Sequence, residues 1–342
     1  MNTTVKTSTD NYSVITGYGL LNNIATLLPD DAKGKKITIV TDDIVAPLYL
    51  DIVKNSIPSA LTFVIPNGEK SKSIEYAEKI SNFLAENNFT RKDYVLALGG
   101  GVVGDLAGFV SSIYMRGIPY VQLPTTLLAG IDSSVGGKTA VNIGYGKNLV
   151  GRIYPPKKVI YDLNTLDTLP KEILLDGLGE GLKYAVLCGG ELFDIMDGAL
   201  NKDNTERFVD LCVAYKKKVV QKDENEAGLR RLLNLGHTIG HAIERESGLK
   251  ILHGVAVAMG LRIIALASCK NGFLNKEDCD RIVALIDKYD VPACPFDIDK
   301  LLTHVSVDKK TEDGIVNLVV IKKIGKCEII KVPLNNIAEF FK

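Results

Sequence analysis

The chain has 342 residues, of which 46% are hydrophobic and 24% charged, a composition that excludes a disordered or fibrous protein. Its length is typical of about two domains. The 41 basic residues balance 41 acidic ones, so no overall field draws the protein to nucleic acid or to an anionic membrane. The six cysteines are scattered without C-x-x-C spacing, and the polar N-terminus lacks the apolar segment of a signal peptide. We therefore expect a cytoplasmic protein with reduced cysteines.

Short β-branched segments alternate with helical segments in the first half of the chain. Strands are expected at residues 36–42, 61–65, 94–98, 120–124 and 159–163, and a helix at 73–87. Strands that alternate with helices pair in parallel, so the pattern predicts a layered α/β sheet. The apolar stretch 94–115 could imitate a membrane span, but its glycines and the central Asp105 favour a strand, a glycine turn and a helix.

The pattern changes near residues 165–170. Apolar residues then recur at helical spacing in the segments 171–188, 204–221, 229–246, 253–269 and 275–289, and a late hairpin is expected around the sequence KIGK. We predict an α/β domain with a parallel sheet over residues 1–168 and a mainly helical domain over 169–342.

A glycine-rich segment, Gly99-Gly100-Gly101-Val102-Val103-Gly104-Asp105, follows the strand expected at 94–98. It has the G-x-G-x-x-G spacing between a strand and a helix, which lets backbone N–H groups approach a pyrophosphate. The acidic ribose ligand that usually follows about 20 residues later is missing, so a tight turn without a ligand is the alternative. A second glycine-rich stretch, 132–148, places Lys138 and Lys147 after glycines in expected loops, where they are typical of anion ligands.

The segment 229–246 carries polar side chains where one face of a helix is expected. The four that share this face are Arg230, Asn234, His237 and His241. Three of the four histidines in the chain, His237, His241 and His253, lie close together in the sequence. Imidazole is the commonest metal ligand, so this cluster favours a metal site over buried structural histidines.

A divalent metal held by two imidazoles usually needs a carboxylate as well, and Glu180 is the candidate. Glu180 lies among glycines, three residues before Lys183 on the same helical face. A plain surface ion pair between these two side chains is the alternative interpretation. Spacing alone leaves open whether His237 and His241 bind a metal together, as in H-x-x-x-H sites.

Four segments, in this order and spacing, closely resemble the 3-dehydroquinate synthase family: GGGVVGDLAGFVSSIYMRG, PTTLLAGIDSSVGGKTAVNIGYGKNLVG, EGLKY and LRRLLNLGHTIGHAIE. The resemblance extends from Asp42 to Lys310. It implies that the α/β domain binds a nucleotide and that the active site lies in the cleft between the two domains. It implies a homodimeric cytoplasmic lyase of the shikimate pathway that uses NAD and one divalent metal ion, zinc or cobalt. Its substrate would be 3-deoxy-D-arabino-heptulosonate 7-phosphate (DAHP), and its products 3-dehydroquinate and phosphate. The implied steps are transient oxidation, β-elimination of phosphate, re-reduction, ring opening and intramolecular aldol closure.

The resemblance also implies the site residues. The metal ligands would be Glu180, His237 and His253, which leaves His241 for hydrogen bonding or acid–base chemistry. The NAD contacts would be Asp42, Glu69, Lys72, Gly101, Val102, Val103, Gly104, Asp105, Thr125, Thr126, Lys138, Lys147, Thr165, Leu166, Asp167 and Thr168. The substrate contacts would be Asp132, Lys138, Asn148, Lys183, Lys216, Arg230, Asn234 and His241, with Arg116 from across the dimer and Lys310 from Asp308-Lys309-Lys310. The chain departs from the family at GRIYPP, where GAFYQP is more common.

Other classes of protein share parts of this pattern. Related sugar phosphate cyclases, such as 2-deoxy-scyllo-inosose synthase or the epi-valiolone synthases, differ around residues 132–138 and the second helix histidine. The sequence GGKTAVN and His241 favour dehydroquinate synthase over them. A metal-dependent polyol dehydrogenase of the glycerol dehydrogenase type has a neutral substrate, which would not require Lys183, Lys216 and Arg230 together. The intact metal and basic sets argue against an inactive NAD-binding regulator.

Overall fold

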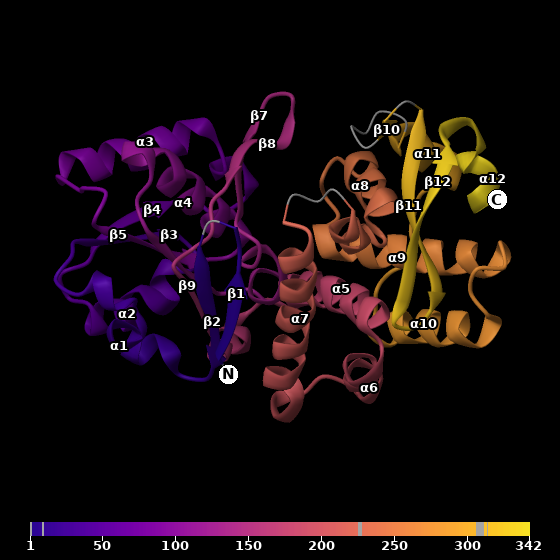
Figure 1. The fold of residues 1–342 in the computed structure, drawn as a ribbon, viewed down its shortest axis with the longest axis horizontal. Coiled ribbons are helices and arrows are strands. Elements are labelled where there is room, and N and C mark those ends of the chain that lie inside the picture. The colour runs from indigo at the N-terminus through magenta and orange to yellow at the C-terminus, as the bar shows by residue number, and fades with distance from the viewer. Residues whose placement is uncertain (1, 9, 225–227, 306–310, 313) are drawn as a thin grey trace. The chain divides into compact units, whose positions relative to one another are not determined.

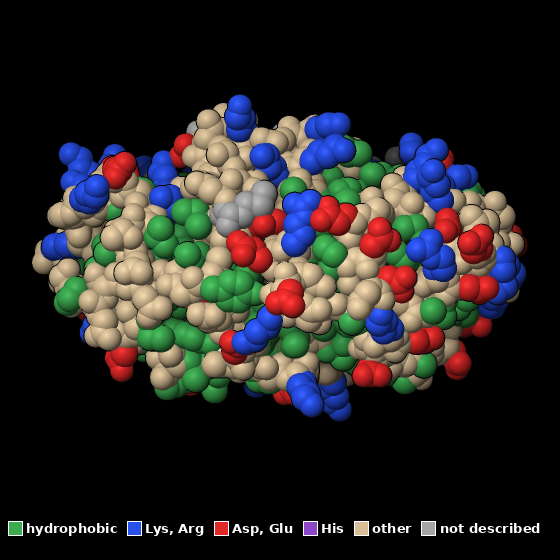
Figure 2. All heavy atoms as spheres, turned by 90° about the horizontal axis from the view of Figure 1, so that it is seen from below, with side chains coloured by type: hydrophobic (Ala, Val, Ile, Leu, Met, Phe, Trp, Pro, Cys, Tyr) green, Lys and Arg blue, Asp and Glu red, His purple; other side chains and the backbone are tan. Residues whose placement is uncertain are grey.

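The structure is a computed structural model that describes residues 2–8, 10–224, 228–305, 311–312 and 314–342. The chain divides into two compact units, Met1–Leu169 and Pro170–Lys342 (Figure 1). On the face drawn in Figure 2, lysine and arginine side chains are interspersed with aspartate and glutamate. This mixture agrees with a net charge of zero.

A seven-stranded sheet forms the centre of unit 1, in the order β1-β2-β9-β6-β5-β3-β4. Its strands are β1 (Asn2–Lys6), β2 (Asn11–Gly17), β3 (Ile37–Asp42), β4 (Leu61–Ile65), β5 (Tyr94–Gly99), β6 (Tyr120–Pro124) and β9 (Lys158–Asp162). Only the β1–β2 pair is antiparallel, and all the other neighbours in this sheet pair in parallel. The five strands expected from the sequence and their parallel pairing are confirmed. The sequence pattern did not indicate the β1–β2 hairpin.

Helices cover both faces of this sheet (Figure 1). The helices of unit 1 are α1 (Ile24–Leu27), α2 (Asp51–Ser56), α3 (Ile74–Glu86) and α4 (Gly101–Ile113). One core cluster joins α1 and α2 to strand residues such as Ile39, and the other joins α3 and α4 to strand residues such as Val40. Because successive side chains on a strand point to opposite faces, strands covered on both sides are apolar throughout. This explains the unbroken apolar sequences of β3 and β5.

Unit 1 also contains a two-stranded antiparallel hairpin, β7 (Lys138–Ile143) and β8 (Gly146–Ile153). Lys138 is the first residue of β7 and Lys147 lies in β8, so the expectation that both lie in loops is wrong. Gly136 and Gly137 precede β7 with φ values of 109° and 65°. Glycine adopts these conformations at little cost, which lets the chain turn directly into a strand at Lys138.

Short helical turns connect the strands and helices of unit 1. They are η1 (Leu20–Asn23), η2 (Asp30–Ala32), η3 (Ala46–Leu50), η4 (Glu69–Ser71), η5 (Tyr114–Arg116), η6 (Ala129–Ser133) and η7 (Leu163–Thr168). The last of them, η7, occupies the region near 165–170 where the sequence pattern changes.

Unit 2 is mainly helical, as the sequence predicts. Its helices are α5 (Lys171–Cys188), α6 (Gly190–Gly198), α7 (Lys202–Lys222), η8 (Leu229–Asn234), α8 (His237–Glu246), α9 (His253–Lys270), α10 (Lys276–Lys288), α11 (Ile298–Val305), η9 (Leu334–Asn336) and α12 (Ile337–Phe341). The strands β10 (Thr311–Glu312), β11 (Ile315–Lys323) and β12 (Lys326–Pro333) form an antiparallel sheet in that order. The β11–β12 pair is the expected late hairpin, with Gly325 in its turn.

The single helix expected over 229–246 is wrong, because the chain breaks between η8 and α8. Gly236 has φ 77°, a left-handed conformation that ends the 3₁₀ helix η8 and precedes the α-helix α8. Arg230 and Asn234 therefore lie on η8, and they do not continue the α-helical face of His237 and His241. A break of this kind is not visible in the apolar periodicity, which continues across Gly236.

Helix α9 is the buried central helix of unit 2, and α5, α8 and α10 all pack against it. By length and composition alone α9 could cross a membrane, but 67% of its apolar window is buried inside the unit. A mostly buried helix of this kind is typical of the core of a water-soluble domain.

Glycines allow α5 and the start of α8 to approach α9 closely. A Cβ atom on Gly179 of α5 would lie 2.0 Å from the carbonyl oxygen of Gly254, and one on Gly254 would lie 1.8 Å from that of Asp176. A Cβ atom on Gly260 of α9 would lie 2.2 Å from the carbonyl oxygen of Gly236. No side chain fits at these distances, so the three segments meet backbone to backbone.

Replacing Gly179 by alanine should lower the stability of the protein. The added methyl group must push α5 and α9 apart, and overpacking of this kind typically costs about 1–3 kcal/mol, partly offset by the better helix propensity of alanine, about 1 kcal/mol. Gly198→Ala in α6 is the matched control, since nothing lies within 4 Å of the added atom. Chemical denaturation measures both variants. Equal unfolding free energies for the two would contradict the backbone contact.

Candidate metal centre and nucleotide-binding edge

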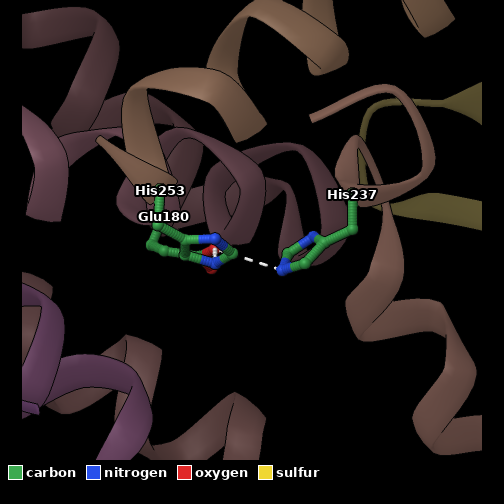
Figure 3. A group of neighbouring side chains, drawn as sticks. All are labelled: Glu180, His237 and His253. Atoms are coloured by element: carbon green, nitrogen blue, oxygen red, sulfur yellow. Dashed lines mark ion pairs between the residues drawn. The ribbon is translucent and has the colours of Figure 1, made fainter. Parts of the chain in front are cut away.

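Three side chains with metal-ligating atoms meet in unit 2, and each is next in sequence to one of the glycine contacts. Glu180 follows Gly179 in α5, His237 follows Gly236 and begins α8, and His253 precedes Gly254 and begins α9. The close approach of the three backbones therefore brings the three side chains together. One ligand atom from each lies within 4.8 Å of the others (Figure 3).

The carboxylate of Glu180 lies between the two imidazole rings. Its Oε1 atom is 3.3 Å from Nε2 of His237 and 3.4 Å from Nε2 of His253 (Figure 3). Its Oε2 atom contacts Nζ of Lys183. The side chains of Glu180 and Lys183 are 1% and 2% exposed, so the interpretation of this pair as a surface ion pair is wrong.

The charges around Glu180 determine its ionisation. Burial by itself would raise the pKa of Glu180, but the Lys183 ammonium and the His253 ring outweigh burial and lower this pKa to about 2. Burial would likewise lower the pKa of His253, yet its contacts with Glu180 and Glu244 raise that pKa to about 10. Glu180 is thus a carboxylate at neutral pH, surrounded by positive or ionisable nitrogen groups.

This set of atoms fits a divalent cation. One carboxylate and two imidazoles are the protein ligands of many catalytic zinc sites, which keep a further position open. Both oxygen atoms of Glu180 are buried, and Lys183 compensates Oε2. The Oε1 atom faces the two imidazole rings, so this side of the carboxylate is the one that an ion between the rings would contact.

A carboxyl group on α5 also fixes the start of α9. The Oδ1 atom of Asp176 accepts a 2.6 Å hydrogen bond from the backbone N–H of Gly254, while Leu252, the residue before α9, provides no side-chain cap. Burial raises the pKa of Asp176, and the hydrogen bond from Gly254 partly opposes this shift. Asp176 therefore satisfies an N–H group of the first turn of α9 and holds His253 near α5.

Two further residues of α8 adjoin the cluster. The ring of His241 is 5.4 Å from that of His237 and 5.8 Å from that of His253, measured between centroids. Glu244 is a residue that the sequence interpretation missed, and its Oε2 atom lies 3.1 Å from Nδ1 of His253. The signal was present, since Glu244 follows His237 and His241 at helical spacing.

Three of the basic residues singled out in the sequence are buried. Lys183, Lys216 and Arg230 are 1%, 6% and 3% exposed. Arg230 is held by its backbone N–H, which donates to Asp223, and by its guanidinium, which donates to the Glu224 carbonyl oxygen at 2.6 Å. Buried cations require compensating groups, and Glu180 is such a group for Lys183.

In unit 1 many of the candidate NAD residues follow the carboxyl ends of parallel strands. Asp42 ends β3, Glu69 and Lys72 follow β4, Gly101 to Asp105 follow β5, Thr125 and Thr126 follow β6, and Thr165 to Thr168 follow β9. Because parallel strands all end at the same edge of the sheet, these residues share that edge. The order of the strands changes direction between β3 and β5, the place where open α/β sheets bind ligands.

The start of α4 fits the phosphates of a dinucleotide. Its N-cap, Gly100, has no side chain to bond the free N–H groups of the first turn, which are therefore available to an anion. A Cβ atom on Gly99 would lie 2.6 Å from Val103, so glycine is required for close packing of β5 and α4. Lys72 pairs with Asp105 of α4 at 2.5 Å, which places an ammonium group beside this turn.

The β7–β8 hairpin is tied to the same region of unit 1. The backbone N–H of Asn142 donates to the carbonyl oxygen of Lys72 at 2.9 Å, and its side chain donates to Oε1 of Glu69 at 2.8 Å. Asn142 also accepts a 2.9 Å hydrogen bond from the backbone N–H of Asn148. The hairpin therefore carries Asn148 in a fixed place relative to η4.

The remaining candidate substrate residues lie in different elements of the chain. Asp132 lies in η6, Arg116 ends η5 with φ 67°, and Asn234 ends η8. Lys310 falls outside the described residues, as do its neighbours Asp308 and Lys309.

Comparison with known proteins agrees with these features. The family model for the 3-dehydroquinate synthase N-terminal domain matches residues 62–176, and that for the 3-dehydroquinate synthase C-terminal domain matches residues 177–311. The chain is 42% identical to 3-dehydroquinate synthase from Desulforamulus reducens, over 94% of this chain and 93% of that protein. It is 38% identical to 3-dehydroquinate synthase from Streptococcus suis, over 100% of both chains.

A solved structure has a similar fold. It is the 2-epi-5-epi-valiolone synthase of Streptomyces hygroscopicus, determined with NAD+ and Zn2+ bound. The TM-score is 0.86 at 27% sequence identity, and the match covers 96% of this chain and 95% of that one. The family models and the full-length relatives together show that the chain belongs to the 3-dehydroquinate synthase family.

Proposed function

We propose that this protein is a lyase that converts DAHP into 3-dehydroquinate and phosphate, with NAD and one divalent metal ion, zinc or cobalt, as cofactors. The observation that carries the proposal is the convergence of Glu180, His237 and His253 in a chain of the 3-dehydroquinate synthase family. The related 2-epi-5-epi-valiolone synthase, which binds NAD+ and Zn2+, supports the choice of cofactors.

Glu180, His237 and His253 would hold the metal ion. When bound, the ion would polarise substrate oxygen atoms, and NAD would take up and return a hydride within each turnover. Glu180 contributes a negative charge that is already ionised at neutral pH. The two rings contribute nitrogen ligands whose places are set by the first residues of α8 and α9.

Unit 1 would bind NAD at the carboxyl edge of its sheet, and unit 2 would bind the metal and the substrate. The proposed NAD contacts are Asp42, Glu69, Lys72, Gly101 to Asp105, Thr125, Thr126, Lys138, Lys147 and Thr165 to Thr168. The uncapped first turn of α4 supports this role, because its N–H groups suit the pyrophosphate.

The substrate carries a phosphate and a carboxylate, which suit buried basic side chains. We assign Lys183, Lys216 and Arg230 to these anionic groups, since all three are almost fully buried. The further proposed contacts are Asp132, Lys138, Asn148, Asn234, His241 and Lys310. His241 lies beside the cluster of ligands and would exchange protons with substrate oxygens, a role that histidine often has in enzymes.

A homodimer in the cytoplasm is the proposed state of the enzyme. The six cysteines are scattered without C-x-x-C spacing, which suits a reducing compartment. Arg116 would reach the phosphate group of the partner subunit's substrate.

Phosphate release without accumulation of NADH is the expected outcome of an assay with DAHP, NAD and Zn2+. NAD is regenerated in each turnover, so phosphate should exceed the enzyme-bound NAD many times over. Phosphate is measured by a colorimetric assay and NADH by its absorbance, with a reaction lacking DAHP as the control. NADH formed in proportion to the DAHP consumed would contradict a lyase and favour a dehydrogenase.

Loss of a ligand should lower the metal content of the purified protein. Glu180→Gln and His253→Ala each remove one of three protein ligands, and chelation of the metal should remove activity from the unmodified enzyme. His304→Ala is the matched control, because this histidine pairs with Glu246 outside the cluster. Metal analysis decides the result. Full occupancy in both ligand variants would exclude this ligand set and make His237 with His241 the next candidate.

His241→Ala should lose activity while it retains both cofactors. General acid–base catalysis typically contributes about 10²–10⁴-fold to the rate, and a loss of this order is expected. Metal analysis and titration with NAD test whether binding is intact. If the metal is lost in parallel with activity, His241 is itself a ligand and its assignment to proton transfer is wrong.

A further inference from the structure

Glu244 lies beside the candidate metal ligands without being one of the three. It is 7% exposed and lies in α8, at helical spacing from His237 and His241. Its Oε2 atom is 3.1 Å from Nδ1 of His253, on the opposite side of the ring from Glu180. The His253 ring is therefore placed between two carboxylates, one at each nitrogen atom.

The two candidate imidazole ligands are oriented by different groups. Nδ1 of His237 lies 3.1 Å from the backbone carbonyl oxygen of Leu235, which can only accept a hydrogen bond. With an ion bound between His237 and Glu180, Nε2 gives its lone pair to the ion, and the proton on Nδ1 is donated to this carbonyl oxygen. At His253 the corresponding acceptor is the side chain of Glu244.

A carboxylate at Nδ1 has the same consequence for His253. With an ion bound between Glu180 and the ring, Nε2 gives its lone pair to the ion, so the ring proton lies on Nδ1, where the acceptor is Glu244. The Nε2 atom lies 3.4 Å from Oε1 of Glu180, toward the candidate ion. Carboxylate–histidine pairs of this type orient metal ligands and raise their basicity.

We propose that Glu244 is a positioning residue that keeps the proton of His253 on Nδ1 and directs Nε2 to the metal ion. This inference rests on the proposed function, in which Glu180, His237 and His253 hold that ion. The role of Glu244 can be tested by substitution of its side chain. The acceptor for His237 is a backbone oxygen atom, which substitution of a side chain does not remove.

An alternative use of Glu244 makes a distinct prediction. His241, Glu244 and His253 also have ligand atoms within 4.8 Å of one another and could form an ion site of their own. Such a site lies on the Glu244 side of the ring, so it would take Nδ1 of His253 as the ligand. Metal coordination at Nε2 of His253 would therefore indicate that Glu244 positions the ring. Coordination at Nδ1 would indicate that Glu244 is itself a ligand.

The experiment measures Zn2+ affinity of the full chain, without NAD or substrate, by competition with a chelator. Glu244→Ala should weaken binding by about 10–100-fold, and Glu244→Gln, which keeps an oxygen acceptor, should fall between it and the unmodified protein. Glu246→Gln is the control on the same helix, because Glu246 pairs with Lys300 and His304. Its affinity should stay within about twofold of the unmodified protein, since it orients no ligand.

Protein labelled with ¹⁵N at its histidines gives a second measurement. A purely structural role of Glu244 would leave this measurement unchanged. The chain has only four histidines, so long-range ¹H–¹⁵N spectra of the Zn2+-loaded protein are simple to assign. His253 should show a slowly exchanging proton on Nδ1 and metal coordination at Nε2. In Glu244→Gln the signal of this proton should shift, while the His237 signals should stay in place.

The outcomes separate the inference from the function on which it rests. If the unmodified protein does not bind Zn2+, the proposed metal site is wrong. If it binds and Glu244→Ala matches it, or if His253 coordinates through Nδ1, the positioning role is wrong and the metal site stands. If Glu244→Ala fails to fold, the affinity and spectrum of Glu244→Gln decide the matter.

Discussion

Backbone contact at glycines is the constraint on which the site in unit 2 depends. Carboxylate and imidazole side chains are short, so three of them meet only when their backbones lie close together. Gly179, Gly236 and Gly254 permit this approach, and each is next in sequence to one of the three candidate ligands. A methyl group at any of these contacts would separate the segments and move the ligand atoms apart, even though no ligand had been replaced.

The second constraint is the burial of charge. Glu180 and Lys183 are both removed from water, and a buried ion pair gains stability only when its remaining atoms are also compensated. The rings of His237 and His253 provide this compensation on one side of the carboxylate. Glu180 therefore belongs both to the buried interior of unit 2 and to the group of candidate ligands, which links the core to the chemistry of the site.

Much of the fold follows from local patterns. The strands of the parallel sheet are apolar because both faces are covered, and α5 begins at Lys171 after Pro170, where periodicity and proline agree. The break before α8 depends on the φ angle of Gly236, which periodicity does not report, so one helix was expected over 229–246. The β7–β8 hairpin was missed because its residues resemble a glycine-rich loop.

Part of the candidate site was likewise predicted from the sequence, and part of it was found only in the structure. Histidine is rare in this chain, so its clustering predicted a metal site, and residue type identified Glu180 as the carboxylate. Glu244 shares the helical spacing of His237 and His241, but glutamate on a helix is usually a solvated residue, so spacing alone did not single it out. Only the packing of α8 on α9 brings Glu244 to His253.

The glycines of α5 have a consequence for native-state dynamics. Gly179 and Gly181 weaken the intrinsic helicity of α5 by about 1 kcal/mol each, so the turn that carries Glu180 persists through its packing on α9 and on Phe208. An ion bound by Glu180 would suppress local opening of this turn, which makes amide exchange in α5 a direct reporter of occupancy.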